Sequence, residues 1–562
     1  MTSGRPAETP DTTGAFPRLT QEQIGALAAQ GERRPTAEGE VLYAEGDRGR
    51  DFYVVLSGLV ALAESWGTGD EEVTGVHGPG RFLGGLSLFT GRAMLLTAVV
   101  REAGEVLAVP VPRLREVLAS DQALGDLILR AFLVRHSALT GIGAGCRILG
   151  SRFDPDTRRL REFATRNRIP HRWIDLEDDP HSEDLLRELG VRPEDTPVVI
   201  CGRQAILRHP SPAELARAVG LPVPAQRQVS GDLVVVGAGP AGLAAAVYGA
   251  SEGLRTIVMD GIAAGGQAGT ASRIENYLGF PAGISGAELS DRAVVQARKF
   301  GAELTVPIEA VSMERADGHF TVRCAGGTEV TGHTLLVASG ARYRRLVVPG
   351  MDTYESSSVY YAATDVEVRL CAGDPVAVAG GGNSAGQAAL FLARTAAQVN
   401  LIVRAADLGK DMSRYLVDRI GRSPAITVLT STEIRELRGK DHELHELTVE
   451  NTQTGEWSTI PARALFVFIG AEPHSDWLGG QVALDGRGFV LTGPTAATAA
   501  SDTWRDLGRE PLVLETSLPG VFAVGDVRSG SVKRVASAVG EGSMAVRLVH
   551  TYLGGVRADA ER

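Results

Sequence analysis

The stretch that decides the fold of the C-terminal half is Leu233-Val234-Val235-Val236-Gly237-Ala238-Gly239-Pro240-Ala241-Gly242. Its apolar run predicts a buried strand, and its glycines predict a tight turn that opens a helix. A second stretch of this kind is Val376-Ala377-Val378-Ala379-Gly380-Gly381-Gly382-Asn383-Ser384-Ala385. Such turns let the backbone approach a pyrophosphate, which the unpaired N–H groups of the helix start then bind. The two turns predict two bound dinucleotides; a glycine-rich turn without a ligand is the alternative interpretation of each.

Length and charge narrow the function classes. A chain of 562 residues has room for about three or four domains. The formal net charge of −11 argues against a nucleic-acid partner, which needs clustered Lys and Arg. The polar first residues hold no apolar signal-peptide core, and no later stretch has the unbroken apolarity of a membrane span. The sequence therefore predicts a soluble, cytoplasmic protein that binds neither nucleic acid nor a membrane.

The cysteines bear on any redox mechanism. The four of them, Cys146, Cys201, Cys324 and Cys371, are widely separated along the chain. Their spacing contains no C-x-x-C and is typical of neither a disulfide framework nor a metal site. The sequence thus predicts no metal and no internal redox cysteine pair.

The N-terminal region is predicted to hold a tail and a β-roll. Residues 1–15 are polar, and we expect a disordered tail. Residues 16–140 combine a helix pattern, short apolar runs broken by Gly and Asp, and two closing helix patterns, which predicts a small β-roll with helices. With Glu45-Gly46-Asp47 and Tyr53-Val54-Val55-Leu56-Ser57-Gly58, this region resembles the cyclic-nucleotide-binding fold of bacterial regulators.

The ligand contacts of that fold are replaced here. In the family a glutamate holds the ribose hydroxyl and an arginine pairs with the cyclic phosphate. Here Phe82-Leu83-Gly84-Gly85-Leu86-Ser87 has glycine at the glutamate position, and Met94 to Leu96 stand at the arginine position. Unless Arg92 substitutes for that arginine, the site lacks charge-assisted pairing. Cyclic-nucleotide binding is therefore doubtful, and a packing or signal-relay role is expected.

Residues 146–221 alternate strand and helix patterns, which predicts an α/β domain. With Thr196-Pro197 opening its third strand, it resembles the thioredoxin fold, whose signature there is a cis-proline. Where that family carries C-x-x-C, this chain has Asp154-Pro155-Asp156-Thr157. The resemblance therefore implies a docking or structural module. Residues 222–231 are predicted to be a linker into the following half.

The C-terminal half shows several further motifs in a fixed order. They are Asp260 after a strand pattern, Gly265-Gly266-Gln267, Ile274-Glu275-Asn276-Tyr277, Leu336-Val337-Ala338-Ser339-Gly340, Gly520-Val521-Phe522-Ala523-Val524-Gly525-Asp526 and Lys533-Arg534-Val535-Ala536-Ser537-Ala538. Together with the two glycine turns they resemble low-molecular-weight thioredoxin reductase over about residues 232–553. The resemblance implies two Rossmann-like α/β domains and a homodimer. The FAD-binding domain would span 232–346 and 463–562, and the NAD(P)-binding domain 347–462.

The site residues follow from this resemblance. Those expected to hold FAD are Gly237, Gly239, Pro240, Ala241, Gly242, Asp260, Gly266, Gln267, Asn276, Gly525, Asp526 and Ala536. Those expected to hold NAD(P)H are Gly380, Gly382, Asn383, Ser384, Ala385 and Arg404. Thioredoxin reductases clamp the adenosine 2′-phosphate of NADPH with several arginines, and only Arg404 lies in register here. NADPH is the expected nucleotide, and NADH remains the alternative.

The resemblance fails where thioredoxin reductases carry their redox cysteines. Aligning Tyr361-Ala362-Ala363-Thr364-Asp365 on that motif puts Ala362 and Asp365 at the two cysteine positions. Asp365 becomes the candidate catalytic residue, as a proton carrier or a group that tunes the flavin. The sequence then predicts an oxidoreductase that passes electrons from flavin directly to an external acceptor such as thioredoxin or ferredoxin. Two alternatives are a ferredoxin-NADP reductase-like enzyme and a non-catalytic flavin redox sensor with signalling N-terminal modules.

Overall fold

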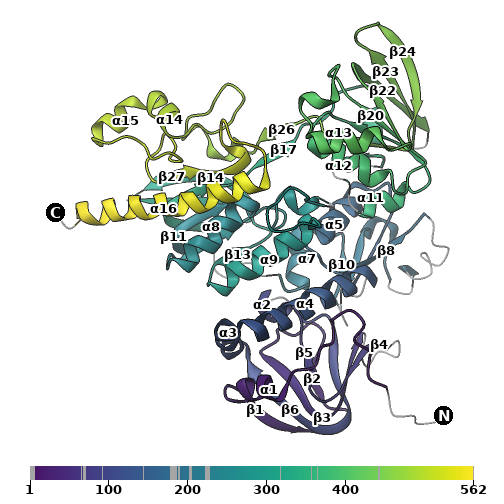
Figure 1. Cartoon of the computed structure of the whole chain (residues 1–562), viewed down its shortest axis with the longest axis vertical. Coiled ribbons are helices and arrows are strands. Elements are labelled where there is room, and N and C mark those ends of the chain that lie inside the picture. Colours follow the sequence, from purple (N-terminus) through teal and green to yellow (C-terminus); the bar gives the residue numbers. More distant parts are fainter. Residues whose placement is uncertain are drawn as a thin grey trace. The chain divides into compact units, whose positions relative to one another are not determined.

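The protein is described from a computed structural model. It covers residues 7–560 except 65, 67–70, 91–92, 143–144, 178–185, 188–189, 202–204, 222–227, 272, 317, 356, 362, 364 and 441–442. The chain divides into two compact units, Met1–Pro224 and Ala225–Arg562 (Figure 1). Over the described residues, no helix combines the length and the apolar character that crossing a membrane requires.

The first part of the N-terminal unit is a β-roll with helices, as the sequence predicts. Its six-stranded sheet has the order β1-β6-β3-β4, with β2 on β6 and β5 on β3. The rings of Phe52 and Phe82 from the sheet pack against Phe132 of α4, with centroids 5.4 to 6.3 Å apart. The elements are α1 (Gln21–Ala28), β1 (Glu32–Thr36), β2 (Val41–Tyr43), β3 (Asp51–Glu64), β4 (Glu72–His77), β5 (Phe82–Leu83), α2 (Ser87–Thr90), β6 (Thr97–Pro110), α3 (Val111–Ser120) and α4 (Gln122–Ile142).

The prediction of a disordered tail over residues 1–15 is wrong for the described residues 7–15. The Thr9 N–H donates to the Val76 carbonyl at 3.1 Å, and the Val76 N–H donates to Thr9 Oγ1 at 2.8 Å. Ala15 is 4% exposed. This segment lies along β4, whose edge offers backbone partners that offset the entropy of ordering it.

The second part of the N-terminal unit is an α/β domain. Its four strands have the order β10-β9-β7-β8. Strand β8 is parallel to β7, and β9 is antiparallel to both β7 and β10. The Thr196–Pro197 peptide bond is cis. The elements are β7 (Cys146–Gly150), α5 (Pro155–Arg166), β8 (His171–Asp175), η1 (Pro193–Asp195), β9 (Val198–Cys201), β10 (Ala205–Arg208) and α7 (Pro212–Ala218).

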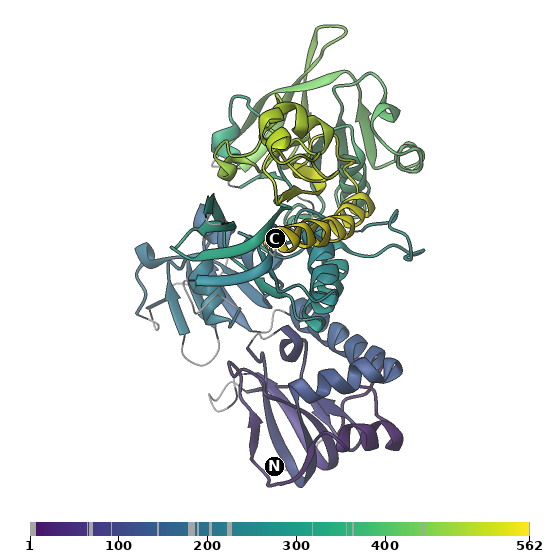
Figure 2. The ribbon, with the colours of Figure 1, turned by 90° about the vertical axis from the view of Figure 1, so that its left-hand side faces the viewer.

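The C-terminal unit contains a seven-stranded sheet of order β13-β12-β11-β16-β15-β14, with β27 beside β16. Strands β12, β11, β16 and β27 run parallel, as a dinucleotide-binding fold requires. Helix α16 packs along α8 (Figures 1 and 2). The elements are β11 (Gln228–Val236), α8 (Pro240–Ser251), β12 (Thr256–Met259), η2 (Ala268–Thr270), α9 (Gly286–Lys299), β13 (Glu303–Thr305), β14 (Ala310–Ala316), β15 (His319–Cys324), β16 (Glu329–Val337), η4 (Asp476–Leu478), α14 (Pro494–Ala499), α15 (Ser501–Asp506), β27 (Val521–Ala523), η5 (Gly525–Val527) and α16 (Val535–Ala560).

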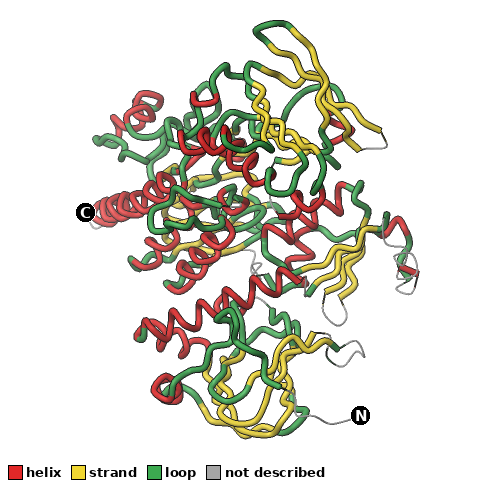
Figure 3. Tube along the Cα trace, turned by 45° about the vertical axis from the view of Figure 1, so that its right-hand side comes forward, coloured by secondary structure: helices red, strands yellow, loops and turns green. Residues whose placement is uncertain are grey.

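A second α/β domain is inserted into the first. Its parallel sheet has the order β18-β25-β19-β20-β21, and a separate sheet holds β22, β23 and β24 (Figure 3). Strands β17 and β26 pair where the chain enters and leaves this domain. The elements are β17 (Ala341–Tyr343), α10 (Met351–Tyr354), β18 (Val359–Tyr360), α11 (Asp365–Leu370), β19 (Pro375–Ala379), α12 (Asn383–Leu392), β20 (Gln398–Ile402), η3 (Leu408–Lys410), α13 (Arg414–Gly421), β21 (Ile426–Leu429), β22 (Thr432–Lys440), β23 (Glu443–Asn451), β24 (Glu456–Pro461), β25 (Ala464–Val467) and β26 (Ala471–Pro473).

Two predicted boundaries need correction. Strand β11 begins at Gln228, which pairs with Glu329, so the linker predicted over 222–231 extends too far. Strand β25 pairs with β18 and β19, so the second FAD segment does not begin at residue 463. Buried strands of both domains have similar apolar sequences, and only the pairing shows to which sheet a strand belongs.

Candidate active site

The first glycine turn links β11 to α8, and two of its glycines are required by the protein itself. Gly237 has a φ of +109°, and a Cβ there would lie 2.1 Å from the Ala338 carbonyl oxygen. A Cβ on Gly242 would lie 1.8 Å from the Gly237 carbonyl oxygen. These two glycines therefore allow the turn and the close packing of α8 on β11.

Gly239 is different, because its protein surroundings do not require a glycine. Its φ of −73° and ψ of −175° suit any residue. The nearest described atom to a Cβ there is the Gly266 Cα, at an ordinary contact distance of 3.8 Å. In the described structure no side chain caps the start of α8 at this point. The open face and the helix N–H groups fit an approaching pyrophosphate.

The second glycine turn, between β19 and α12, repeats this arrangement. Gly380 has a φ of +143°, and its Cβ would lie 2.4 Å from the Phe468 carbonyl oxygen. Gly382 is extended, with a φ of −94° and a ψ of 179°. Among the described residues, no atom lies within 4 Å of a Cβ placed on Gly382. Both turns thus leave one glycine, Gly239 in the first and Gly382 in the second, facing open space at a helix N-terminus.

Asp260 lies beside the first turn, and its carboxylate holds the backbone there. One oxygen accepts the Ala238 N–H at 2.9 Å. The other accepts the Ile262 and Ala263 N–H groups at 2.9 and 3.1 Å. Asp260 therefore fixes the turn, and its remaining lone pairs are those that could accept a ribose hydroxyl.

Three predicted residues belong to the loop after β12. A Cβ on Gly266, which has a φ of +52°, would lie 2.9 Å from the Gly239 Cα, so this loop touches the first turn. The Gln267 amide donates to the Ala341 carbonyl of β17. Asn276 is exposed. The structure brings Gly266 to the site directly and uses the Gln267 side chain to tie the loop to β17.

The Gly525-Asp526 turn reaches the same place from the end of the chain. A Cβ on Gly525 would lie 3.1 Å from the Ala241 Cβ, and one on Gly542 of α16 would lie 2.1 Å from the Ala241 carbonyl oxygen. The close packing of α16 on α8 therefore brings this turn to the start of α8. Ala536 is exposed in the first turn of α16.

A glutamate that the sequence reasoning missed secures this turn. Glu541 accepts the Gly525 N–H at 2.7 Å and pairs with Arg528 at 2.5 Å. The Glu541 side chain is 12% exposed. Its position as a charged residue inside an otherwise apolar stretch of α16 was the sequence signal that could have found it. The pKa of Asp526 is raised above its usual value, mainly because the carboxyl is buried. The charge of Lys533 opposes this rise in pKa, and the charge of Glu541 adds to it. Lys533 donates to the Asp526 backbone carbonyl.

The residues predicted to hold NAD(P)H at the second turn have different surroundings in the structure. The Asn383 amide donates to Ser413 Oγ at 3.0 Å and its oxygen accepts the Ser413 N–H at 2.7 Å. This side chain therefore holds the start of α13. Ser384 is exposed, Ala385 is buried, and Arg404 is exposed just after β20.

Asp365 begins α11, but its side chain and the whole of Ala362 lie outside the described residues. Cys371 and Cys324 are free, buried thiols. The pKa of Cys371 is raised to about 12, mainly by burial. The pKa of Cys324 is raised to about 11 by burial. Both behave as small core residues without thiolate chemistry near neutral pH.

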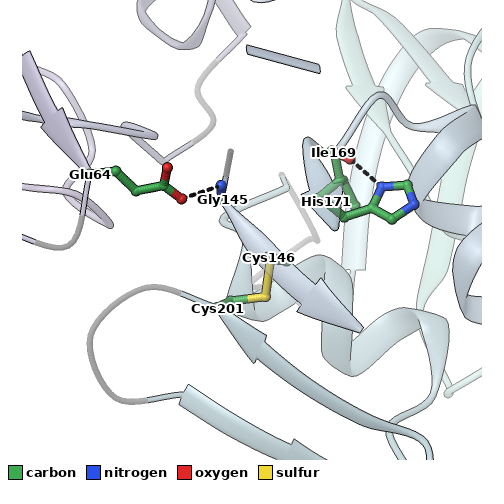
Figure 4. The surroundings of a disulfide bond; sticks show 6 residues. All are labelled: Glu64, Gly145, Cys146, Ile169, His171 and Cys201. Carbon is green, nitrogen blue, oxygen red and sulfur yellow. Dashed lines mark hydrogen bonds between the residues drawn. A yellow bond between two sulfur atoms is a disulfide. The ribbon is translucent and has the colours of Figure 1, made fainter. Parts of the chain in front are cut away.

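The prediction that the chain lacks an internal cysteine pair is wrong. Cys146 and Cys201 form a disulfide with an S–S distance of 2.09 Å (Figure 4). They are 55 residues apart in sequence, and the antiparallel pairing of β7 with β9 places them directly opposite each other. A pairing set by the sheet leaves no spacing signal in the sequence.

In the β-roll, an arginine donates to carbonyls of residues 82–87, the stretch aligned with the nucleotide-binding cassette of the family and called the cassette below. Arg135 of α4 is 6% exposed. It donates to the Ala15 carbonyl at 2.7 Å and to the Phe82 and Gly84 carbonyls at 3.1 Å each. Burial is the main cause that lowers its pKa to about 10. Arg92, the sequence candidate for a phosphate contact, lies outside the described residues.

Two α/β domains, one inserted into the other and each with a glycine turn after a parallel strand, define a protein of the class that binds two dinucleotides. A family model described as "Pyridine nucleotide-disulphide oxidoreductase" matches residues 231–542, and one described as "Cyclic nucleotide-binding domain" matches residues 33–121. The chain belongs to the pyridine nucleotide-disulphide oxidoreductase family. It is an NAD(P)H-dependent FAD oxidoreductase, as the sequence predicts.

Thioredoxin reductases are among the proteins similar to it. That of Schizosaccharomyces pombe is 33% identical over 331 residues, which cover 57% of this chain and 96% of the relative. NADPH-dependent thioredoxin reductase 3 of Arabidopsis thaliana is 34% identical over 328 residues, 57% of this chain and 58% of that protein. The crystal structure of Lactococcus lactis thioredoxin reductase (FR conformation) has a TM-score of 0.52 and 26% identity, and covers 58% of this chain and 99% of its own.

Proposed function

We propose that this protein uses NADPH to reduce the disulfide of a thioredoxin-class protein. The observation that carries the two dinucleotide sites of this proposal is the pair Gly239 and Gly382, whose missing side chains the described surroundings do not explain. The similarity to thioredoxin reductases along nearly their whole length supports the choice of substrate. FAD supplies the two-electron chemistry that connects a hydride donor to a disulfide.

The residues of this chain act by binding and orientation. The N–H groups at the starts of α8 and α12 would each take a pyrophosphate, whose negative charge the helix ends favour. Asp526, held in place through Gly525 and Glu541, would accept hydrogen bonds from the ribitol chain. The start of α16, with Ala536, would place its positive end at the pyrimidine edge of the flavin.

Arg404 is the residue we assign to the choice of NADPH over NADH. It is exposed at the end of β20, one strand from the second glycine turn. In this fold, residues at the end of that strand meet the adenosine ribose. A guanidinium pairs with the 2′-phosphate of NADPH through charge-assisted hydrogen bonds that NADH cannot make.

We further propose that the α/β domain of residues 146–221 has a thioredoxin-like fold. Its strand order, with one parallel neighbour and two antiparallel steps, supports this assignment. The N-cap residue Asp154 accepts the Thr157 N–H at 2.8 Å where such a domain carries a dithiol. Without a dithiol at that place, we assign this end of the domain a docking role rather than a redox one. By resemblance to thioredoxin reductases we also propose a homodimer, which light scattering of the purified protein tests, and a cytoplasmic location, which cell fractionation tests.

The test is anaerobic reduction of the FAD-loaded full chain by NADPH or NADH, followed by mixing with oxidised thioredoxin. The proposal requires faster flavin bleaching by NADPH and reoxidation by thioredoxin with loss of its disulfide. Arg404→Gln should raise the KM for NADPH by about tenfold and leave that for NADH unchanged. Arg422→Gln, which changes another exposed arginine of the same domain, is the matched control. Reoxidation by oxygen or ferredoxin but not by thioredoxin would overturn the substrate assignment.

A further inference from the structure

The Cys146–Cys201 disulfide closes one end of a strand pair. Cys146 is the first residue of β7 and Cys201 the last residue of β9. Both side chains belong to the core that α5 and α7 cover, together with Leu160, Leu215 and Leu221. The residues are 4% and 8% exposed. Because they form the last rung of the β7–β9 ladder, fraying of that end alone would reach them, without opening the sheet.

This end of the sheet is also where the α/β domain meets the β-roll. The N–H of Gly145, the residue before Cys146, donates to Glu64 Oε1 at the end of β3 at 3.0 Å (Figure 4). Glu64 is part of the β-roll and Gly145 leads directly into β7, so this hydrogen bond ties the entrance of the α/β domain to the β-roll. One peptide bond separates the crossing contact from the disulfide.

A second crossing contact lies at the end of α7. A Cβ on Gly220, which has a φ of +69°, would lie 2.9 Å from the Ala93 backbone nitrogen of the β-roll. Gly220 precedes Leu221, which packs in the same core as the two cysteines. Ala93 belongs to the segment between α2 and β6, and its neighbour Met94 accepts a hydrogen bond from Ser87 Oγ of the cassette at 2.9 Å. The contacts at Gly145 and Gly220 are therefore each one residue away from the core that contains the disulfide.

The surroundings favour uncharged thiols after reduction. His171 on β8 stands opposite Cys146 in the sheet. Its Nδ1 lies 2.8 Å from the Ile169 carbonyl oxygen (Figure 4). Burial is the main cause that lowers the pKa of His171, so its ring is neutral at neutral pH. Opening the bond there would leave two neutral thiols in an apolar core, which tolerates them.

We propose that Cys146–Cys201 is a reducible disulfide that controls the junction between the β-roll and the α/β domain, and that its reductant is a dithiol protein of the thioredoxin class. One thiolate of the reductant attacks a sulfur of the pair, which forms a mixed disulfide and releases the other cysteine as a thiol. The second thiol of the reductant then resolves the mixed disulfide. Two electrons and two protons pass to Cys146 and Cys201, and the reductant leaves as a disulfide.

The consequence is a change in the two crossing contacts. Reduction removes the covalent closure of a 55-residue segment, so the end of the β7–β9 ladder opens more often. Opening there displaces Gly145 from Glu64 and loosens the core around Leu221. Reduction of Cys146–Cys201 would thus change the conformation of the β-roll near its cassette through the contacts at Gly145 and Gly220. This regulatory role goes beyond the proposed reductase activity.

The experiment treats the native full chain with dithiothreitol, or with reduced thioredoxin, and then alkylates and identifies the free thiols by mass spectrometry. Hydrogen exchange is followed in parallel at the peptides that contain Gly145 and Gly220. We expect labelling of Cys146 and Cys201 but not of Cys324 and Cys371, and about tenfold faster exchange at both junction peptides. Neither readout requires NADPH or turnover, so it is independent of the proposed reductase function.

The matched variant is Glu64→Gln, which keeps the disulfide and weakens the acceptor for the Gly145 N–H. Its oxidised form should already exchange faster at the Gly145 peptide and respond less to reduction. The proposal is overturned if the disulfide resists reduction until the protein is denatured. It is equally overturned if the pair is reduced while exchange at both junction peptides stays unchanged, because the bond is then only a structural staple.

Discussion

Replacing Gly239 by alanine tests the reasoning behind the dinucleotide sites. The backbone there already has angles that alanine adopts, and the new Cβ would meet only the Gly266 Cα at 3.8 Å. We therefore expect the unfolding free energy of the apoprotein to change by no more than about 0.5 kcal/mol. The methyl group would instead occupy the open face where a pyrophosphate must approach.

The cost to FAD binding can be worked out from the contacts that would be lost. A methyl group at this point pushes the pyrophosphate away from the helix N–H groups, which removes one or two charge-assisted hydrogen bonds of about 1.5 kcal/mol each. The Kd for FAD of Gly239→Ala should therefore rise by about 10- to 100-fold. Titration of apoprotein with FAD, followed by quenching of flavin fluorescence, measures this change.

Gly242→Ala is the matched comparison, because its Cβ would lie 1.8 Å from the Gly237 carbonyl oxygen. This overlap with backbone should lower the unfolding free energy by about 1–3 kcal/mol, which urea unfolding of the apoprotein detects. One variant then loses binding and the other loses stability. If Gly239→Ala binds FAD as tightly as the unchanged chain, the absence of a side chain at Gly239 does not serve a ligand, and the reasoning fails.

Three further predictions follow from the contacts described above. Glu541→Gln should lower the unfolding free energy by about 1–3 kcal/mol, because the Gly525 N–H and Arg528 lose their carboxylate partner. An unchanged urea midpoint would contradict this prediction. The control is Glu510→Gln, which changes an exposed glutamate. Because burial raises the Asp526 pKa above 3.8, ionising this group costs stability, and stability falls as the pH rises through that raised pKa. Asp526→Asn should therefore flatten this pH dependence and leave the apoprotein at least as stable at neutral pH while it weakens FAD binding, and loss of stability at neutral pH would refute the assignment. Cys371, with a pKa of about 12, is a thiolate to only about one part in ten thousand at pH 8; it should resist iodoacetamide in the native protein, and rapid labelling detected by mass spectrometry would show that it is not a core residue.

Local sequence rules predicted the elements of both dinucleotide sites. A buried strand, a glycine turn and a helix start are coded within about ten residues, so β11 with α8 and β19 with α12 could be placed from sequence. The same rules missed Glu541, because its partner Gly525 is brought to it only by the packing of the turn onto α16. Nor did they show that the Asn383 side chain bonds Ser413, 30 residues away, while its place at the start of α12 stays the predicted nucleotide contact.

What the sequence determined by itself was the set of local conformations: which glycines permit a turn, where helices begin, and that two dinucleotide domains follow a β-roll. Tertiary structure alone decided which distant residues meet. It placed Gly266 and Gly525 against the first turn, assigned β25 to the inserted sheet, and joined Cys146 to Cys201. The physical reason is that steric limits and helix capping act over a few residues, whereas strand pairing and core packing depend on the whole chain and leave no fixed spacing behind.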